Sequence, residues 1–205
     1  MLMKENKKTR QRNRILSKAR SLFWDKGYDK TSMRDIASAC DFEPGNIYNY
    51  FTNKEQLLFE LLLHDHKKVV TPIIQLKDDS SLAPVEKLQS LIKLHIMNSL
   101  VYTRSSRLLG DVELRSLSTN HRKQIIKLRD DYDETLLSII REGKRTGVFV
   151  VNDEKMTCLA IASLLVRSRI WYSPKGRLSS NDIADFIFNF ILSGLQYAIN
   201  RKKVD

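Results

Sequence analysis

The chain has 205 residues, of which 42% are hydrophobic and 29% are charged, a composition typical of a globular protein with one or two domains. Lysine and arginine outnumber aspartate and glutamate by 35 to 24, which gives a net charge of +11. The longest strongly apolar run, residues 158–166, is far shorter than the roughly 20 residues of a membrane-spanning helix. Cys40 and Cys158 lack metal-ligand spacing and indicate no disulfide framework. Because no apolar stretch follows the basic N-terminus, we expect no signal peptide and a cytosolic protein.

Much of the positive charge lies at the N-terminus. Between Met1 and Arg20 there are eight basic residues and one acid, Glu5, so this segment carries +7 (eight minus one) of the net +11. Such a segment fits contact with the phosphates of nucleic acid and a reach into the minor groove. The alternative is a solvated, frayed terminus.

The first helix is predicted over about residues 8–26, with Gly27 as its C-terminal cap. Ser32, followed three residues later by Asp35, forms a capping box that begins the second helix. A break of three residues, 40–42, separates it from a third helix starting near Pro44, which is tolerated in a first turn.

Residues 31–58 therefore form a predicted helix-turn-helix. Small and polar residues at the start of the third helix would let it enter the DNA major groove without a clash. By residue type, Arg34, Asn46 and Asn49 suit base edges, and Pro44 and Gly45 permit close approach. Phosphate contacts are predicted for Thr31, Ser32, Tyr48, Tyr50 and Lys54. Either tyrosine has the alternative of being a half-buried core residue.

Asn53 can cap a fourth helix over residues 53–71, which should stop before Pro72 and connect two domains, 1–52 and 53–205. Residues 77–84 form a polar break. The remaining predicted helices cover residues 85–102, 105–117, 119–145, 153–171 and about 180–200. The expected fold class is all-α, with about nine helices.

The last predicted helix is apolar on two sides. One stripe contains Ile183, Phe186, Ile187, Phe190, Ile191 and Gly194, and a second contains Phe188, Leu192, Leu195 and Ile199. A helix that is apolar on two sides is normally buried on two sides. We expect the second stripe to form the interface of a homodimer, since two-fold symmetry suits palindromic DNA. The alternative is a central helix of a monomer.

The N-terminal pattern resembles the TetR family of transcriptional regulators. The residues that carry the resemblance are Ile15, Ala19, Phe23, Gly27, Tyr28, Thr31, Ser32, Ile36, Ala37, Gly45, Ile47, Tyr48, Phe51, Lys54, Glu55 and Leu57. The resemblance implies three DNA-binding helices, about six helices for ligand binding and dimerisation, and a repressor that leaves its operator when a small molecule binds. The chain departs from the family in the turn, where Cys40-Asp41-Phe42 replaces the usual Ala-Gly-Val, and at Glu43, where Ser or Thr is common.

The C-terminal part is similar, more weakly, to TetR-family regulators that sense CoA thioesters. The similar stretches are residues 142–149 and 171–186. A fatty acyl-CoA ligand needs an apolar tunnel with basic residues at its mouth. The candidate walls are Met97, Tyr102, Leu108 and Trp171, and the candidate basic residues are Arg104, Arg107, Arg115, Arg167 and Arg169. The alternative is that the former are ordinary core residues and the latter are solvated.

Signatures of enzymes and metal sites do not occur in the sequence. There is no glycine-rich phosphate loop and no nucleophile elbow. His64 and His66 are two residues apart and cannot share a helix face, while His95 and His121 are isolated in the sequence. We expect no catalytic residue, metal or cofactor. The expected partners are palindromic double-stranded DNA, a small-molecule effector and a second copy of the chain. The alternatives are a ligand-dependent activator, an effector-independent DNA-binding protein, or an enzyme that carries this N-terminus.

Overall fold

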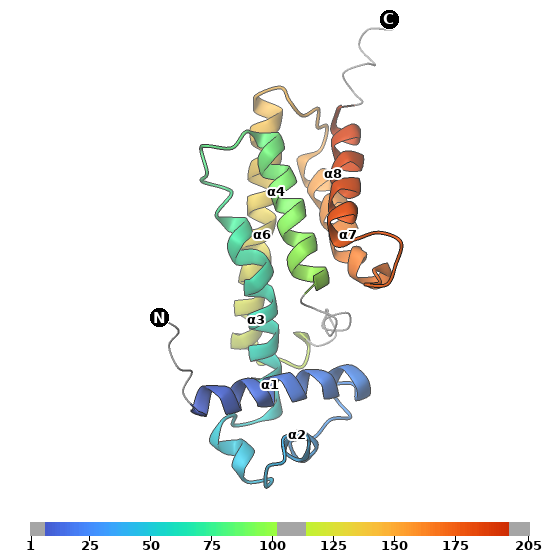
Figure 1. The fold of residues 1–205 in the computed structure, drawn as a ribbon. Coiled ribbons are helices and arrows are strands. Elements are labelled where there is room, and N and C mark those ends of the chain that lie inside the picture. Colours follow the sequence, from blue (N-terminus) through green and yellow to red (C-terminus); the bar gives the residue numbers. More distant parts are fainter. Residues whose placement is uncertain (1–6, 102–113, 197–205) are drawn as a thin grey trace, which may run out of the picture. The chain divides into compact units, whose positions relative to one another are not determined.

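A computed structural model describes residues 7–101 and 114–196 of the chain, in which helices are joined by turns and loops and no strand occurs (Figure 1). The α-helices are α1 (Lys7–Lys26), α2 (Met33–Ala39), α3 (Lys54–Ile74), α4 (Pro84–Ile96), α6 (Thr119–Arg145), α7 (Glu154–Trp171) and α8 (Ser180–Gln196). Two shorter helices are of other types: η1 (Asn46–Asn49) is 3₁₀ and η2 (Met97–Val101) is π. The all-α prediction is confirmed.

The predicted number of nine helices is not matched, since the described residues contain seven α-helices. The predicted third helix is only the 3₁₀ turn η1, held by bonds such as Tyr48 N–H to the Gly45 carbonyl at 3.3 Å. The helix predicted over residues 105–117 lies almost wholly outside the described residues. The predicted stop before Pro72 is wrong, because α3 continues to Ile74 and buries Val70 and Ile73.

The described residues form two compact units, one of residues 7–65 and 114–125 and the other of residues 66–101 and 126–196. Two helices contribute to both units: α3 crosses the division after Asp65 and α6 crosses it after Ile125. The domain boundary expected between residues 52 and 53 stays a prediction.

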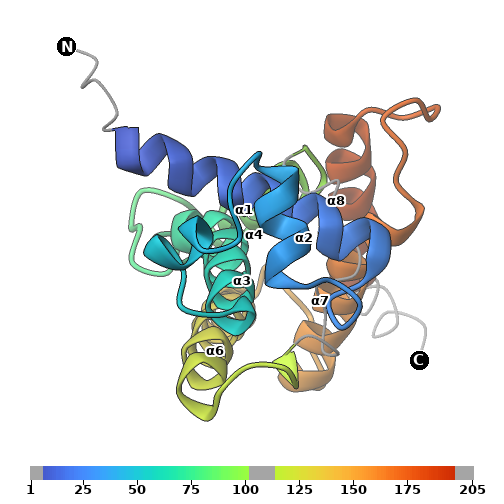
Figure 2. The same cartoon turned by 90° about the horizontal axis from the view of Figure 1, so that it is seen from below.

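The first unit has its own apolar core. Helix α1 buries Ile15, Ala19 and Phe23 at helical spacing, and Gly27 ends it with a positive φ of 85°, as its predicted role as a cap requires. The remaining core side chains come from α2, η1, α3 and the segment before and within the start of α6: Ile36, Ala37, Cys40, Ile47, Phe51, Leu57, Leu58, Phe59, Leu61, Leu62, Leu114, Leu117 and Ile125. Figure 2 shows α2 beside α1, and η1 in turn contacts α2. Ile47 and Phe51 anchor the segment around residue 45 in this core.

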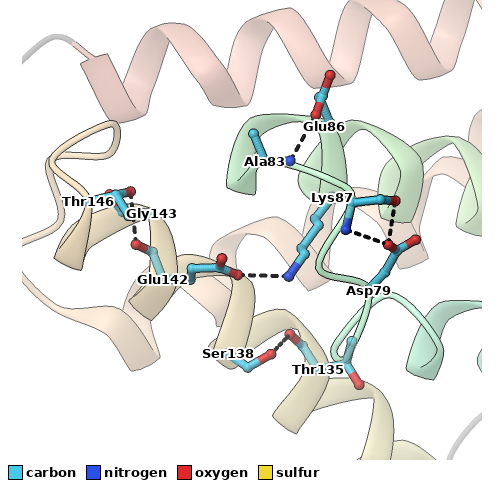
Figure 3. Close-up of polar contacts among 10 residues, drawn as sticks. Asp79, Ala83, Glu86, Lys87, Thr135, Ser138, Glu142, Gly143 and Thr146 are labelled. Carbon is cyan, nitrogen blue, oxygen red and sulfur yellow. Dashed lines mark hydrogen bonds and ion pairs between the residues drawn. The ribbon is translucent and has the colours of Figure 1, made fainter.

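The second unit is built from the C-terminal part of α3, α4, η2, most of α6, α7 and α8, with α4 packed mainly against α8. Its core is apolar and includes Leu88, Leu91, Ile92, Leu136, Ile139, Ile161, Leu165, Ile183 and Ile187. Within this core, the buried ammonium of Lys87 on α4 lies 2.9 Å from the Glu142 carboxylate on α6 (Figure 3). A buried charge is tolerated only with such a partner.

The stretch 142–149 completes the end of α6. Glu142 pairs with Lys87, and the Gly143 position allows the ring of Phe149 to pack, because a Cβ there would stand 2.0 Å from that ring. Gly147 has a φ of 77°, so the chain leaves the helix in a left-handed conformation that glycine favours. Phe149 itself is buried.

Over residues 7–101 and 114–196, no helix has both the length and the apolar character needed to cross a lipid bilayer.

Candidate nucleic-acid interface

The turn between α2 and η1 uses a left-handed aspartate. Asp41 has a φ of 54°, and Asp is among the few residues apart from glycine that adopt this conformation readily. Its carboxylate accepts a hydrogen bond from the Arg14 guanidinium at 2.6 Å, which ties the turn to α1. The Phe42 N–H closes the turn by donating to the Ala37 carbonyl at 2.9 Å. The unusual sequence Cys40-Asp41-Phe42 therefore still forms a tight turn.

The predicted capping box at the start of α2 is confirmed. The Asp35 N–H donates to Ser32 Oγ at 3.1 Å, while the Ser32 N–H and hydroxyl both donate to the Asp35 carboxylate, at 2.8 and 2.7 Å. These hydrogen bonds from Ser32 lower the pKa of Asp35. Ser32 is exposed, but its hydroxyl proton is already used in the hydrogen bond to Asp35.

Thr31 does not lie on the surface, which contradicts its predicted phosphate contact. Its side chain is 1% exposed and its hydroxyl lies 2.8 Å from the Gly27 carbonyl, to which it donates. This bond satisfies a carbonyl at the end of α1. The hydroxyl thus has a structural role.

Lys54 also makes contacts within the chain. Its ammonium donates to the Tyr28 carbonyl at 2.8 Å and lies 4.2 Å from the centre of the Tyr28 ring. The side chain is half-buried. Lys54 consequently fastens the loop before α2 to the start of α3, whatever it contributes to phosphate binding.

The other predicted contact residues form an exposed tip. Arg34 on α2 and Pro44, Gly45, Asn46 and Asn49 in and before η1 are all exposed. Tyr48 is 54% exposed, so it is not a core residue.

Tyr50 does not belong to this tip. It is half-buried, and its ring stacks on Phe42 with 6.0 Å between the centroids and 26° between the planes. Its ring therefore helps to pack the turn, as the alternative interpretation expected.

Gly45 has no structural reason to be glycine. Its backbone is right-handed helical, with φ of −71° and ψ of −29°, which any residue can adopt. A Cβ added there would meet no atom of the described residues within 4 Å. Such a position fits the approach of an outside surface to the backbone.

The basic N-terminal residues from Lys7 onward lie in α1. Arg12 and Arg20 pair with Glu60 and Asp65 on α3, and Arg14 pairs with Asp41. The exposed basic residues Lys7, Arg10 and Lys18 leave further positive charge on α1. Lys7, Arg10, Gln11 and Arg14 line a hollow of about 600 Å³. Residues 1–6 lie outside the described part of the chain.

Glu55 is a site residue whose role in this structure the sequence did not reveal. Its carboxylate accepts the Ser118 N–H at 2.8 Å and lies 2.8 Å from His121 Nδ1, at the start of α6. The His121 ring stacks on Phe59 with 3.8 Å between centroids. Burial would raise the pKa of Glu55, but the hydrogen bonds from Ser118 and His121 outweigh burial and lower it. Because 63 residues separate Glu55 from Ser118, local sequence patterns give no sign of this contact.

The residues predicted to bind a ligand are scattered. Trp171 is 57% exposed and Arg167 is exposed, so neither lines the interior of the second unit. Met97 and Arg169 are half-buried in that unit, while Arg115 is an exposed residue of the first unit. Tyr102, Arg104, Arg107 and Leu108 lie outside the described residues.

The predicted dimer stripe needs correction. Phe188 and Leu195 are 8% and 6% exposed, since both pack into the core of their own chain. Leu192 is half-buried, and Ile199 lies outside the described residues. Instead, Phe186 and Phe190 from the other stripe are 65% and 61% exposed and stack on each other with 6.5 Å between centroids.

Helix α7 carries exposed apolar side chains as well. Met156, Leu159 and Ile170 are 61%, 59% and 60% exposed, at spacings that place them on one side of the helix. Single exposed apolar residues are ordinary, but several on neighbouring helices indicate a surface that a partner covers.

Comparisons with known proteins agree on the family. "Bacterial regulatory proteins, tetR family" matches residues 15–61, and "Tetracyclin repressor-like, C-terminal domain" matches residues 81–195. The HTH-type transcriptional repressor KstR2 of Mycolicibacterium smegmatis is 25% identical over 187 residues, covering 90% of both chains.

Two solved structures illustrate the likeness of fold. A tetR-family regulatory protein from Rhodococcus RHA1 is 29% identical, with a TM-score of 0.81 over 93% of this chain and 98% of that one. AibR, solved with isovaleryl coenzyme A and operator DNA, is 24% identical, with a TM-score of 0.76 over 88% of this chain and 97% of that one, and shows the fold. The relatives are regulators and not enzymes, and the match of the C-terminal family covers more than half of the chain, so the protein belongs to the TetR family of helix-turn-helix transcriptional regulators.

Proposed function

We propose that the protein is a homodimeric repressor that binds a palindromic operator through the exposed tip around η1 and leaves it when a small-molecule effector binds. The observation that carries the proposal is the tip itself. Asn46 and Asn49 present amide groups to solvent beside a glycine that neither packing nor backbone conformation requires. Amide side chains bond adenine through two groups at once, which makes them suitable readers of base edges.

Positive charge beside the tip supports phosphate contact. The exposed lysines and arginine of α1 belong to the same unit as η1. Phosphate contacts fix the register of a protein on DNA, whereas base contacts give the sequence preference. We therefore assign base reading to Asn46, Asn49 and Arg34, and phosphate contact to Tyr48 and α1, since the N–H and hydroxyl of Ser32 already donate to Asp35.

The exposed apolar side chains of α7 and α8 support a homodimer. We propose that a second copy covers Phe186 and Phe190, together with the exposed residues of α7. A two-fold dimer would present two tips, one for each half of a palindrome, about one helical turn of DNA or a multiple apart.

The proposed effector is a CoA thioester. The support is the resemblance of residues 171–186 to regulators of that class, and AibR, which binds isovaleryl coenzyme A and operator DNA, has the same fold. The effector would favour a dimer whose tips do not match the operator spacing, by no more than its difference in affinity for the two states. Helices α3 and α6 contribute to both units and are the natural connectors.

The experiment begins with selection of an operator from random DNA by the full-length protein. Asn46→Ala should then weaken operator binding by about 1–3 kcal/mol and leave binding to random DNA unchanged, since only base contacts distinguish the two. Asn152→Ala, at an exposed position of the second unit, is the matched control and should change neither. Equal losses on operator and random DNA would refute base reading by Asn46, and failure to select any sequence would refute operator binding.

A further inference from the structure

Two polar side chains meet inside the apolar core of the second unit. His95 on α4 and Tyr132 on α6 are 7% and 8% exposed, and His95 Nδ1 lies 3.0 Å from Tyr132 Oη. The rings meet edge to face, with 5.6 Å between centroids and 69° between planes. Placing two polar groups in such a core costs free energy unless their hydrogen bonds are satisfied. The pair thus needs an explanation beyond packing.

Both members of the pair are uncharged near neutral pH. Burial, followed by the positive charge of Arg169, lowers the pKa of His95 to about 3. Burial also raises the pKa of Tyr132. A neutral imidazole and a phenol bring two protons on polar atoms, one N–H and one O–H.

The hydrogen bond between the two side chains uses one of these protons, and the other is not used in it. In one tautomer the Tyr132 hydroxyl donates to Nδ1, and Nε2–H of His95 remains as a donor. In the other tautomer Nδ1–H donates to Tyr132 Oη, and the hydroxyl proton remains. Whichever tautomer is present, one donor is not used within the pair.

The other buried polar groups of this unit's described residues use their hydrogen-bond donors nearby. Ser168 donates to the Leu165 carbonyl at 2.6 Å, Thr135 to the Asp131 carbonyl at 2.8 Å and Ser99 to the Ile96 carbonyl at 3.5 Å. Lys87 is paired with Glu142. The pair His95–Tyr132 is therefore the place in this described core where a donor is left for a ligand.

The backbone beside His95 is irregular as well. Helix α4 ends at Ile96 and continues as the π-helical turn Met97–Val101. π-helical turns are uncommon and occur frequently at functional sites, because a wider turn frees backbone groups and shifts side chains. Met97, in this turn, is half-buried and has a flexible, apolar side chain that adapts to different shapes.

We propose that His95 and Tyr132 anchor the effector by donating a hydrogen bond to an uncharged carbonyl oxygen of an acyl group whose apolar chain lies among the surrounding core residues. The inference rests on the proposed function and makes its ligand class more specific. A neutral donor in apolar surroundings suits a thioester, ester or ketone carbonyl, whereas a carboxylate would lose its hydration without gaining a counter-charge from this pair. The pair thus selects the acyl carbonyl and not a free acid.

The test compares ligands with and without the carbonyl group. A series of acyl-CoA thioesters from acetyl to palmitoyl, including isovaleryl-CoA, is titrated into full-length protein beside the S-alkyl-CoA thioethers of matched length and the free acids. The wild type should bind the preferred thioester at least about tenfold more tightly than its thioether, which is the effect of about one hydrogen bond. The double variant His95→Phe, Tyr132→Phe, which removes both donors, should bring the ratio close to one while thioether binding changes little.

Ser168→Ala is the matched control, because its buried hydroxyl bonds to the Leu165 carbonyl within α7 and outside the π-helical turn, and it should retain the tenfold ratio. Operator binding and thermal unfolding of every variant show which of them fold, and the thioester-to-thioether ratio of the wild type keeps the test available if the double variant does not fold. A wild type that binds thioester and thioether equally, or a folded double variant that still distinguishes them, would overturn the inference. So would a wild type that binds its operator and none of the thioesters, a result that leaves operator binding standing. Loss of operator binding by the wild type would instead refute the proposed function.

Discussion

Glycines 45 and 143 show how one residue type serves two purposes in this chain. At Gly143 a Cβ would overlap the Phe149 ring, and at Gly45 it would meet nothing within 4 Å among the described residues. The first glycine is explained by the interior of the protein. The second is explained only by something outside it, and we propose that this is DNA.

The two glycines give a paired prediction. Gly143→Ala should lower the free energy of unfolding by about 1–3 kcal/mol, because the core must shift to admit the methyl group, and Gly45→Ala should leave it unchanged or slightly higher. Conversely, Gly45→Ala should weaken operator binding. Denaturant unfolding and operator titration of both variants measure the two effects. A Gly45→Ala variant that binds the operator as the wild type does would exclude close approach at this residue.

At the residue scale, the sequence predicted side-chain chemistry better than side-chain exposure. The Ser32–Asp35 box followed from local spacing and is present. Thr31, one residue earlier, is just as polar but points inward, because the end of α1 needs its hydroxyl. Which of two adjacent polar residues faces solvent depends on contacts across the fold, and no local pattern encodes them.

At the scale of elements, α1 combines core packing with charge. Part of its positive charge is bound internally, in the pairs of Arg12, Arg14 and Arg20 with acids. The exposed basic residues outside these pairs, such as Lys7 and Arg10, are therefore the ones expected to displace counterions from DNA on binding.

The double variant Lys7→Gln, Arg10→Gln should therefore weaken binding to operator and random DNA alike. It should also reduce the dependence of log K on log salt by about one to two, because each phosphate contact contributes about −0.9 to that slope. Lys175→Gln, an exposed position in the second unit, is the control for a change of net charge alone. An unchanged slope would show that the N-terminal part of α1 is a solvated surface.

Glu55 connects the first turn of α3 with the start of α6. Its pKa in the folded protein lies below its usual value near 4.5, so its contribution to stability is present above that value and is lost as the pH falls through the folded pKa. We expect the free energy of unfolding to decrease less steeply between about pH 5 and pH 3 in Glu55→Gln than in the wild type.

Asp182→Asn is a useful comparison for this prediction. Asp182 also has a lowered pKa, through hydrogen bonds from Ser179, but it serves the start of α8 and does not join distant segments. Circular dichroism during urea unfolding at a series of pH values measures both. Identical pH profiles for Glu55→Gln and the wild type would show that this carboxylate contributes nothing to acid stability.

The sequence indicated most helices because their apolar spacing and end signals are local. The start of α6 and the ends of α1 and α7 fall within a residue or so of the prediction. The predicted third helix is only the short η1, which begins after Pro44 and Gly45 and ends at Asn49. The predicted end of α3 failed because burial of Ile73 outweighs the cost of Pro72 near the end of the helix.

For the whole molecule, the proposed homodimer requires a surface on which two copies would meet. The sequence identified α8 as apolar on two sides but assigned the sides wrongly, since only the packed structure shows that Phe188 faces inward and Phe186 outward. The proposed symmetry of the operator depends on this surface.

Phe190→Asp should accordingly convert a dimer to a monomer and greatly weaken operator binding, because a carboxylate in an apolar interface loses its hydration. Asn181→Asp is the control, since residue 181 is exposed on the opposite side of α8, nine residues or about 900° earlier. Light scattering coupled to size exclusion measures the mass. If Phe190→Asp keeps the mass of a dimer, the second copy does not cover this surface.

The end of α6 has a consequence for tracing effectors across related proteins. Residues 142–149 are explained by the Lys87 partner, the space for Phe149 and the left-handed Gly147. Each of these three features finishes a helix, so proteins that share the stretch are expected to share this architecture. Under the proposal for His95 and Tyr132, the equivalents of those two positions, and not this stretch, would be the ones to compare for ligand class.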